Sequence, residues 1–142
     1  VGVYNLEMAR IYNYLLQSFG KKFMIINSLD GYDEISLTSD AKIITEKGEK
    51  VMSPFQMAKR SIDPKEIYGG DSVEEAASIF LKILKGEGSI AQNAVVTANA
   101  AMALHMTGKY PDYDAAFSAA EESLVSGKAN KALQKLLSIR RK

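Results

Sequence analysis

An acidic loop in the first quarter of the sequence carries the residue types best suited to chemistry. Asp30-Gly31-Tyr32-Asp33-Glu34 places neighbouring carboxylates in a short polar segment that contains a glycine. Mg²⁺ prefers oxygen ligands, and one or two carboxylates usually hold it together with waters and substrate phosphate oxygens. Gly31 allows the backbone to turn sharply. The residues therefore indicate either a magnesium site or an acidic surface turn, since acidic pairs are common in loops.

The other candidates for chemistry have simpler structural explanations, and the catalytic residues stay unknown. His105 is the only histidine, and no residue near it in the sequence supplies a partner for proton transfer. A packed or solvated side chain at a helix end is favoured. Gly69-Gly70-Asp71 is shorter than the glycine patterns that cradle phosphate, which favours a structural turn. The sequence has no cysteine, which excludes disulfides, thiolate metal sites and cysteine nucleophiles.

The elements that lead into the acidic loop predict an α/β fold. Asn5 can cap a helix that ends near Phe19, and Lys22–Asn27 is typical of a buried strand. With Val1–Tyr4 interpreted as the end of an earlier strand, the order strand, helix, strand predicts a parallel βαβ unit. Ligands of open α/β sheets bind at the carboxyl ends of strands, and the acidic loop follows such an end.

The rest of the sequence predicts a hairpin and then a run of helices. Strands near Ala41–Thr45 and Lys50–Ser53 flank the turn Glu46–Glu49, which predicts an antiparallel pair. Further helices are expected from Asp71, with Glu74 in a capping box, to about Lys85, from Ser89 to about Met106, from Asp112 to about Ser126, and from Ala129 to Ile139. We expect one α/β domain over residues 1–142, with a mixed sheet begun by the parallel βαβ unit and packed by about five helices.

Composition excludes several classes of protein. Lysine and arginine number 18 against 17 acidic residues, so the net charge of +1 offers no argument for nucleic acid or an anionic membrane as a partner. No apolar run is long enough to span a bilayer, and no segment has the order of a signal peptide. A soluble cytoplasmic protein is expected. The start at Val1, without an initiator Met and inside an apparent strand, predicts a fragment of a longer chain.

The order of several motifs resembles the anthranilate phosphoribosyltransferase family. Gly2–Asn5 comes first, and Asp30–Thr38 follows after a helix and a strand. Later segments in family order are Gly69-Gly70-Asp71, the Gly86 and Gly88 break, Ala98–Ala101 and Ser126–Ala129. The resemblance covers essentially all 142 residues and is most specific over Asp30–Ser36.

The resemblance implies an enzyme of tryptophan biosynthesis. Such an enzyme transfers a phosphoribosyl group from phosphoribosyl pyrophosphate to the amine of anthranilate and releases pyrophosphate. In that family the acidic pair that matches Asp33 and Glu34 binds Mg²⁺ associated with the pyrophosphate. The sequence departs from the family at Asn27-Ser28, where a His-Gly pair is frequent, and at Glu75, where an asparagine is common.

The resemblance also implies that much of the enzyme lies before Val1. The glycine-rich phosphoribosyl pyrophosphate loop and the residues that hold anthranilate belong to that part, so no substrate-binding residue is assigned within these 142 residues. A homodimer is expected only with the N-terminal helical domain that would precede Val1. The 142-residue chain by itself is predicted to be inactive.

Two alternatives remain open. The first is an enzyme of the same fold with another acceptor, such as a pyrimidine nucleoside phosphorylase or a family paralogue. The second is a non-catalytic module that binds a partner through its helices and whose acidic loop is indifferent to cations.

Overall fold

The computed structural model describes residues 1–140 of the chain and divides into two compact units. Unit 1 comprises Val1–Asp63, and unit 2 begins at Pro64. The expectation of a single domain over residues 1–142 stays a prediction. None of the helices in residues 1–140 combines the length and the apolar character needed to cross a membrane.

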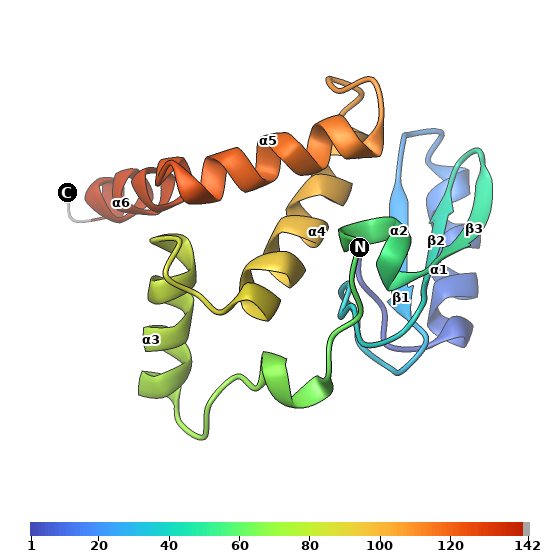
Figure 1. The fold of residues 1–142 in the computed structure, drawn as a ribbon. Helices are drawn as coiled ribbons and strands as arrows, with labels where there is room; N and C mark the ends of the chain where they lie inside the picture. Colours follow the sequence, from blue (N-terminus) through green and yellow to red (C-terminus); the bar gives the residue numbers. More distant parts are fainter. Residues whose placement is uncertain (141–142) are drawn as a thin grey trace. The chain divides into compact units, whose positions relative to one another are not determined.

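Unit 1 contains a small antiparallel sheet with a helix against it (Figure 1). Its elements are α1 (Leu6–Ser18), β1 (Met24–Ser28), β2 (Ala41–Thr45), β3 (Gly48–Met52) and α2 (Pro54–Ala58). The strand order is β1-β2-β3, and both pairings are antiparallel.

A parallel bridge adds the first residues of the chain to β1. Gly2 pairs with Ile26, where Val3 N–H donates to Ile26 O at 2.9 Å and Ile26 N–H donates to Val1 O at 3.0 Å. The β2–β3 pair confirms the hairpin. Of the predicted parallel βαβ unit, the described residues show this isolated bridge across α1, while the sheet of β1, β2 and β3 is antiparallel.

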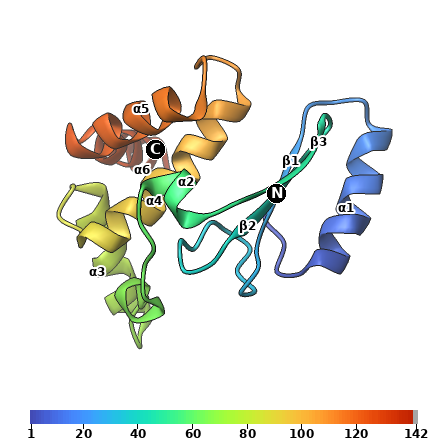
Figure 2. The same cartoon turned by 45° about the vertical axis from the view of Figure 1, so that its right-hand side comes forward.

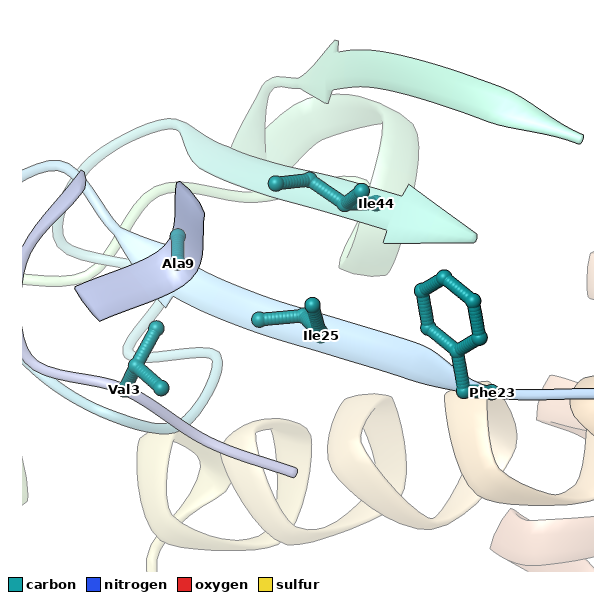
Figure 3. Close-up of a cluster of buried hydrophobic side chains, with 5 residues drawn as sticks. All are labelled: Val3, Ala9, Phe23, Ile25 and Ile44. Carbon is teal, nitrogen blue, oxygen red and sulfur yellow. The ribbon is translucent and has the colours of Figure 1, made fainter. Parts of the chain in front are cut away.

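The side chains between α1 and the sheet form a hydrophobic core cluster of unit 1. Val3, Ala9, Phe23, Ile25 and Ile44 are buried together (Figure 3). Ile25 and Ile44 face each other across the antiparallel register, and Ile25 is fully buried. Burial of such a side chain contributes roughly 1.5–3 kcal/mol. This core holds β1 in place, and the acidic loop extends from the end of β1.

Local signals define the ends of α1. The side chain of Asn5 accepts a hydrogen bond of 2.8 Å from Met8 N–H, which satisfies one of the free donors at the helix start. Gly20 has a φ of 60°, a conformation that favours glycine and stops the helix. Both residues act as the sequence predicts.

The hairpin is tighter than predicted. Thr45 pairs with Gly48, so two residues form the turn and β3 begins at Gly48 rather than at Lys50. Gly48 has a φ of 136°, which lets the chain re-enter the sheet immediately after the turn. The longer turn was wrong because the glycine was assigned to the turn and not to the strand.

Unit 2 is helical. Its elements are η1 (Pro64–Ile67), α3 (Val73–Leu84), α4 (Ile90–Met106), α5 (Tyr113–Val125) and α6 (Lys128–Arg140). Figures 1 and 2 show α5 crossing α4 at an angle near the turn that joins them, and the two helices contact each other. Both helices bury small side chains, Ala98 and Ala101 in α4 and Ala116 and Ala120 in α5. Alanines let two helices approach closely, which explains the alanine-rich sequence of α4.

The cap of α3 differs from the prediction by one residue. Ser72, and not Asp71, is the N-cap, and its hydroxyl accepts from Glu75 N–H at 3.1 Å. Asp71 N–H donates instead to the Glu75 carboxylate at 2.9 Å. The capping box with Glu74 was therefore wrong, because Ser72 places its oxygen over the first turn and shifts the helix start.

Candidate metal site

The acidic loop, residues 30–34, begins immediately after β1 and is closed by backbone hydrogen bonds. Ser28 N–H donates to Tyr32 O at 3.0 Å, and Gly31 N–H donates to Ser28 O at 2.9 Å. Gly31 has a φ of 99°, which a residue with a side chain adopts only with strain. Gly31 therefore provides the sharp turn that its place in the sequence predicts.

Two buried polar residues at the end of β1 fix the loop and β1 through hydrogen bonds to backbone groups. Ser28 Oγ donates to Glu34 O at 2.6 Å and accepts from Ser36 N–H at 3.2 Å. Asn27 Nδ2 donates to Val3 O at 2.8 Å and so ties β1 to the first residues of the chain. Sequence reasoning singled out Asn27-Ser28 only as a departure from the family and missed this structural role. A polar pair at the end of an otherwise apolar strand was the signal available.

Asp30 is engaged inside the loop region. Its carboxylate accepts from Ser39 Oγ at 2.8 Å, from Ser36 Oγ at 3.4 Å and from Thr38 Oγ1. Its backbone N–H donates to Ser39 Oγ at 3.2 Å. These hydroxyl groups bind Asp30 to the segment that follows the acidic loop. Asp30 thus ties the loop to the segment after it, whereas Asp33 and Glu34 are exposed.

Asp33 and Glu34 are exposed and lie beside each other. Loss of water around the carboxyl, a side-chain hydrogen bond with Asp33 and the negative charge of Asp33 together raise the pKa of Glu34 above its ordinary value. The raised pKa means that Asp33 and Glu34 hold a proton between them more readily than isolated acids do, because no positive charge in the described part of the chain compensates the pair. The pair is chemically suited to a divalent cation, which supplies that charge.

The donor set fits Mg²⁺ that is shared with a substrate. Within residues 1–140, no group of three or more His, Cys, Asp or Glu side chains is arranged to hold a metal ion. Asp33 and Glu34 offer two carboxylates, which is the number that Mg²⁺ commonly takes from protein when phosphate oxygens and waters complete its coordination. These two residues would hold the ion.

The other candidate residues belong to unit 2 and have structural surroundings. The His105 ring meets Tyr113 edge-on at 6.3 Å between ring centroids, and His105 Nδ1 is buried without a hydrogen-bond partner in the structure. At the glycine turn, the pKa of Tyr68 is raised, mainly by its side-chain hydrogen bond with Asp71. Glu75 packs against Gly70, where a Cβ would lie 2.8 Å from Glu75 Cγ. Both places favour the structural interpretation.

Comparison with known proteins identifies the family. The family described as glycosyl transferase family, a/b domain, matches residues 1–130. The chain belongs to the glycosyl transferase family. Anthranilate phosphoribosyltransferase of Flavobacterium johnsoniae is 52% identical over 136 residues, which is 96% of this chain and 41% of that protein. The glycosyl transferase chain thus spans about two fifths of the length of the curated relative.

Solved structures agree with the fold of this glycosyl transferase chain. Anthranilate phosphoribosyltransferase from Thermus thermophilus matches 99% of the chain and 42% of its own length with a TM-score of 0.89 at 24% identity. The enzyme from Saccharomyces cerevisiae in complex with PRPP and Mg matches 94% of the chain and 38% of its own length, with a TM-score of 0.79 at 20% identity. The predicted α/β fold is confirmed.

Proposed function

We propose that this chain is the α/β part of an anthranilate phosphoribosyltransferase and that Asp33 and Glu34 bind Mg²⁺ together with the diphosphate of phosphoribosyl pyrophosphate. The observation that carries the proposal is the paired carboxylates beside the end of β1, where the charge of Asp33 contributes to the raised pKa of Glu34. The similarity to the Flavobacterium johnsoniae enzyme supports this choice of reaction.

The chemistry asked of this part of the enzyme is electrostatic. Departure of pyrophosphate concentrates negative charge on the leaving group, and a bound Mg²⁺ neutralises part of it. Asp33 and Glu34 fix where that neutralisation occurs. Gly31 and Ser28 hold the loop so that the two carboxylates keep one geometry. Catalysis then depends on positioning, without a covalent enzyme intermediate.

The remaining functions of the transferase are proposed to reside in sequence that the longer relatives have and that this chain does not cover. The chain spans 41% of the Flavobacterium johnsoniae relative. Recognition of anthranilate belongs, in this proposal, to the other part. A longer protein that contains this chain should therefore use anthranilate, whereas turnover of a pyrimidine nucleoside with phosphate would favour the phosphorylase alternative.

A cation titration tests the site directly. The chain is dialysed to equilibrium against Mn²⁺ with pyrophosphate, and the excess of Mn²⁺ on the protein side measures binding. Asp33→Asn and Glu34→Gln should each weaken the apparent affinity at least about 10-fold, since each removes a charged ligand. Asp40→Asn, which removes an exposed acid outside the loop, is the control and should bind like the wild type. Equal binding by all four proteins would support the cation-indifferent module instead.

A further inference from the structure

Gly2 lies beside the acidic loop because of the parallel bridge to β1. Val3 N–H and Ile26 N–H make the two bridge hydrogen bonds of 2.9 and 3.0 Å, and the Val1 amino group donates to Met24 O at 2.8 Å. Val3 is buried in the core of unit 1, and its carbonyl accepts from Asn27 Nδ2 at 2.8 Å. Gly2 is therefore held in position because both of its neighbours in sequence, Val1 and Val3, are hydrogen-bonded to β1.

The backbone of Asp33 occupies the space that a side chain at Gly2 would need. A Cβ on Gly2 would lie 1.8 Å from Asp33 O, 2.8 Å from Asp33 C and 3.3 Å from Asp33 Cβ. The first two distances are shorter than any non-bonded carbon contact, and both involve backbone atoms that cannot rotate away. Any residue larger than glycine must displace either residues 1–3 or Asp33 itself.

We propose that Gly2 is a positioning residue for the acidic pair, a role that rests on the proposed function. Its bare backbone is the surface against which the Asp33 carbonyl rests, while Ser28 Oγ holds the Glu34 carbonyl on the next residue. Each carboxylate is thus positioned by a contact to the backbone of its own residue, from Gly2 to Asp33 and from Ser28 to Glu34. Gly2 touches no ligand and acts only through Asp33.

The anchoring of residues 1–3 to β1 decides which partner moves in a Gly2 variant. The bridge hydrogen bonds, the buried Val3 side chain and the Asn27 hydrogen bond all hold these residues against β1. The loop at Asp33 is exposed and lies on the surface. A methyl group at Gly2 therefore shifts the loop at Asp33 and leaves residues 1–3 in place.

The test compares Gly2→Ala with Gly69→Ala in the 142-residue chain. Gly69 is a matched control, because no heavy atom lies within 4 Å of its hypothetical Cβ and its φ is ordinary. Without metal, the amide resonances of Asp33 and Glu34 should move in Gly2→Ala and stay in Gly69→Ala, while Ile26 N–H keeps its protection from hydrogen exchange. With Mn²⁺ and pyrophosphate, Gly2→Ala should bind about 10-fold or more weakly than the wild type.

Each other result overturns the proposal. Loss of Ile26 protection in Gly2→Ala, with or without a change in Mn²⁺ affinity, would show that residues 1–3 move instead of the loop at Asp33. Wild-type affinity together with unmoved Asp33 and Glu34 resonances would do the same. A wild-type chain that fails to bind Mn²⁺ with pyrophosphate removes the proposed function and this role together, whereas wild-type binding with equal binding by Gly2→Ala removes only this role.

Discussion

Single residues of the acidic loop divide into those that shape it and those left for a ligand. Asp30 is surrounded by hydroxyl donors, and Ser28 bonds to the backbone on the far side of the loop. Asp33 and Glu34 instead lie beside each other with like charge, which contributes to the raised pKa of Glu34. Three acids so close in sequence therefore differ in their hydrogen-bond partners, and the proposed division of roles rests on that difference.

Asp30→Asn is expected to destabilise unit 1 by about 1 kcal/mol. The amide keeps the size of the carboxylate but lacks its charge, and one of its two polar ends becomes a donor facing hydroxyl groups of Thr38 and Ser39. Urea unfolding of both proteins measures the change. Glu46→Gln in the hairpin turn removes the same charge from an exposed position and should stay within about 0.5 kcal/mol of the wild type. Equal stability of Asp30→Asn and wild type would contradict the role of these hydrogen bonds.

At the scale of elements, capping side chains determine where the helices begin. Asn5, Ser72, Ser89 and Asp112 each accept a hydrogen bond from the backbone N–H of the third residue further on. Ser89 also belongs to a complete capping box, because the Gln92 side chain accepts from Ser89 N–H at 3.0 Å. This arrangement satisfies donors at both ends of the first turn of α4.

Ser89→Ala is expected to lower the free energy of unfolding by about 1 kcal/mol, since the first turn of α4 loses its side-chain acceptor. Ser118→Ala in α5 is the matched control. Its hydroxyl donates to Asp114 O within the helix, where the carbonyl already serves the helix ladder. Guanidinium unfolding should show the Ser89 variant shifted and the Ser118 variant unchanged or slightly stabilised. A reversed order would argue against the cap.

The contact between α4 and α5 should make unit 2 sensitive to alkaline pH. Loss of water around the half-buried hydroxyl and then the charge of Asp114 raise the pKa of Tyr113, and the hydroxyl donates to Ala98 O at 3.3 Å. Folding therefore favours the neutral phenol. This contribution is complete below the pKa of an unfolded tyrosine, about 10, and declines as pH rises above it.

Thermal unfolding between pH 8 and 12 measures this dependence. The wild type should lose at most about 1.4 kcal/mol per pH unit above a pH of about 10, and less after solvent screening. Tyr113→Phe should have a lower Tm at pH 8 and a flatter decline at alkaline pH. Tyr14→Phe, at an exposed position, should keep the wild-type profile. Parallel curves for Tyr113→Phe and wild type would rule out the linkage.

At the scale of the whole molecule, unit 2 leaves several apolar side chains accessible. Val96 of α4 belongs with Ala100, Ala103 and Leu104 to the lining of an apolar cavity of about 420 Å³ in unit 2. No residue of α3 is buried, and Phe80 on that helix is 52% exposed. The alanine-rich α4 thus buries some of its residues and leaves others accessible.

The 142-residue chain, mixed with phosphoribosyl pyrophosphate, Mg²⁺ and anthranilate, is expected to show no turnover above background. It spans 41% of the length of the Flavobacterium johnsoniae enzyme, and none of its residues is assigned to acceptor binding. Consumption of anthranilate, followed chromatographically, is the measurement, and the intact relative is the positive control. Turnover by the chain would show that both substrates find complete sites within it.

Much of the fold follows from local patterns in the sequence. Asn5 and Gly20 delimit α1, Ser89 starts α4, and the alternation of strand and helix predicts the βαβ unit. Asp33 and Glu34 were selected as the candidate metal ligands from their type, their place in the loop and the family resemblance, and this assignment stays a prediction. The fold predictions succeed because capping, turn geometry and hydrophobic periodicity act over a few residues, so a short window of sequence contains the whole cause.

Tertiary packing decides the remaining features. The contact of Gly2 with Asp33, the tie from Asn27 to Val3 and the three hydroxyls on Asp30 join residues that no local pattern pairs. The first two depend on the parallel bridge that brings the first residues of the chain to β1, and the third on the fold of the segment after the acidic loop. The acidic pair can thus be identified in the sequence, whereas the contacts proposed to position it form only once distant backbone segments have been brought together.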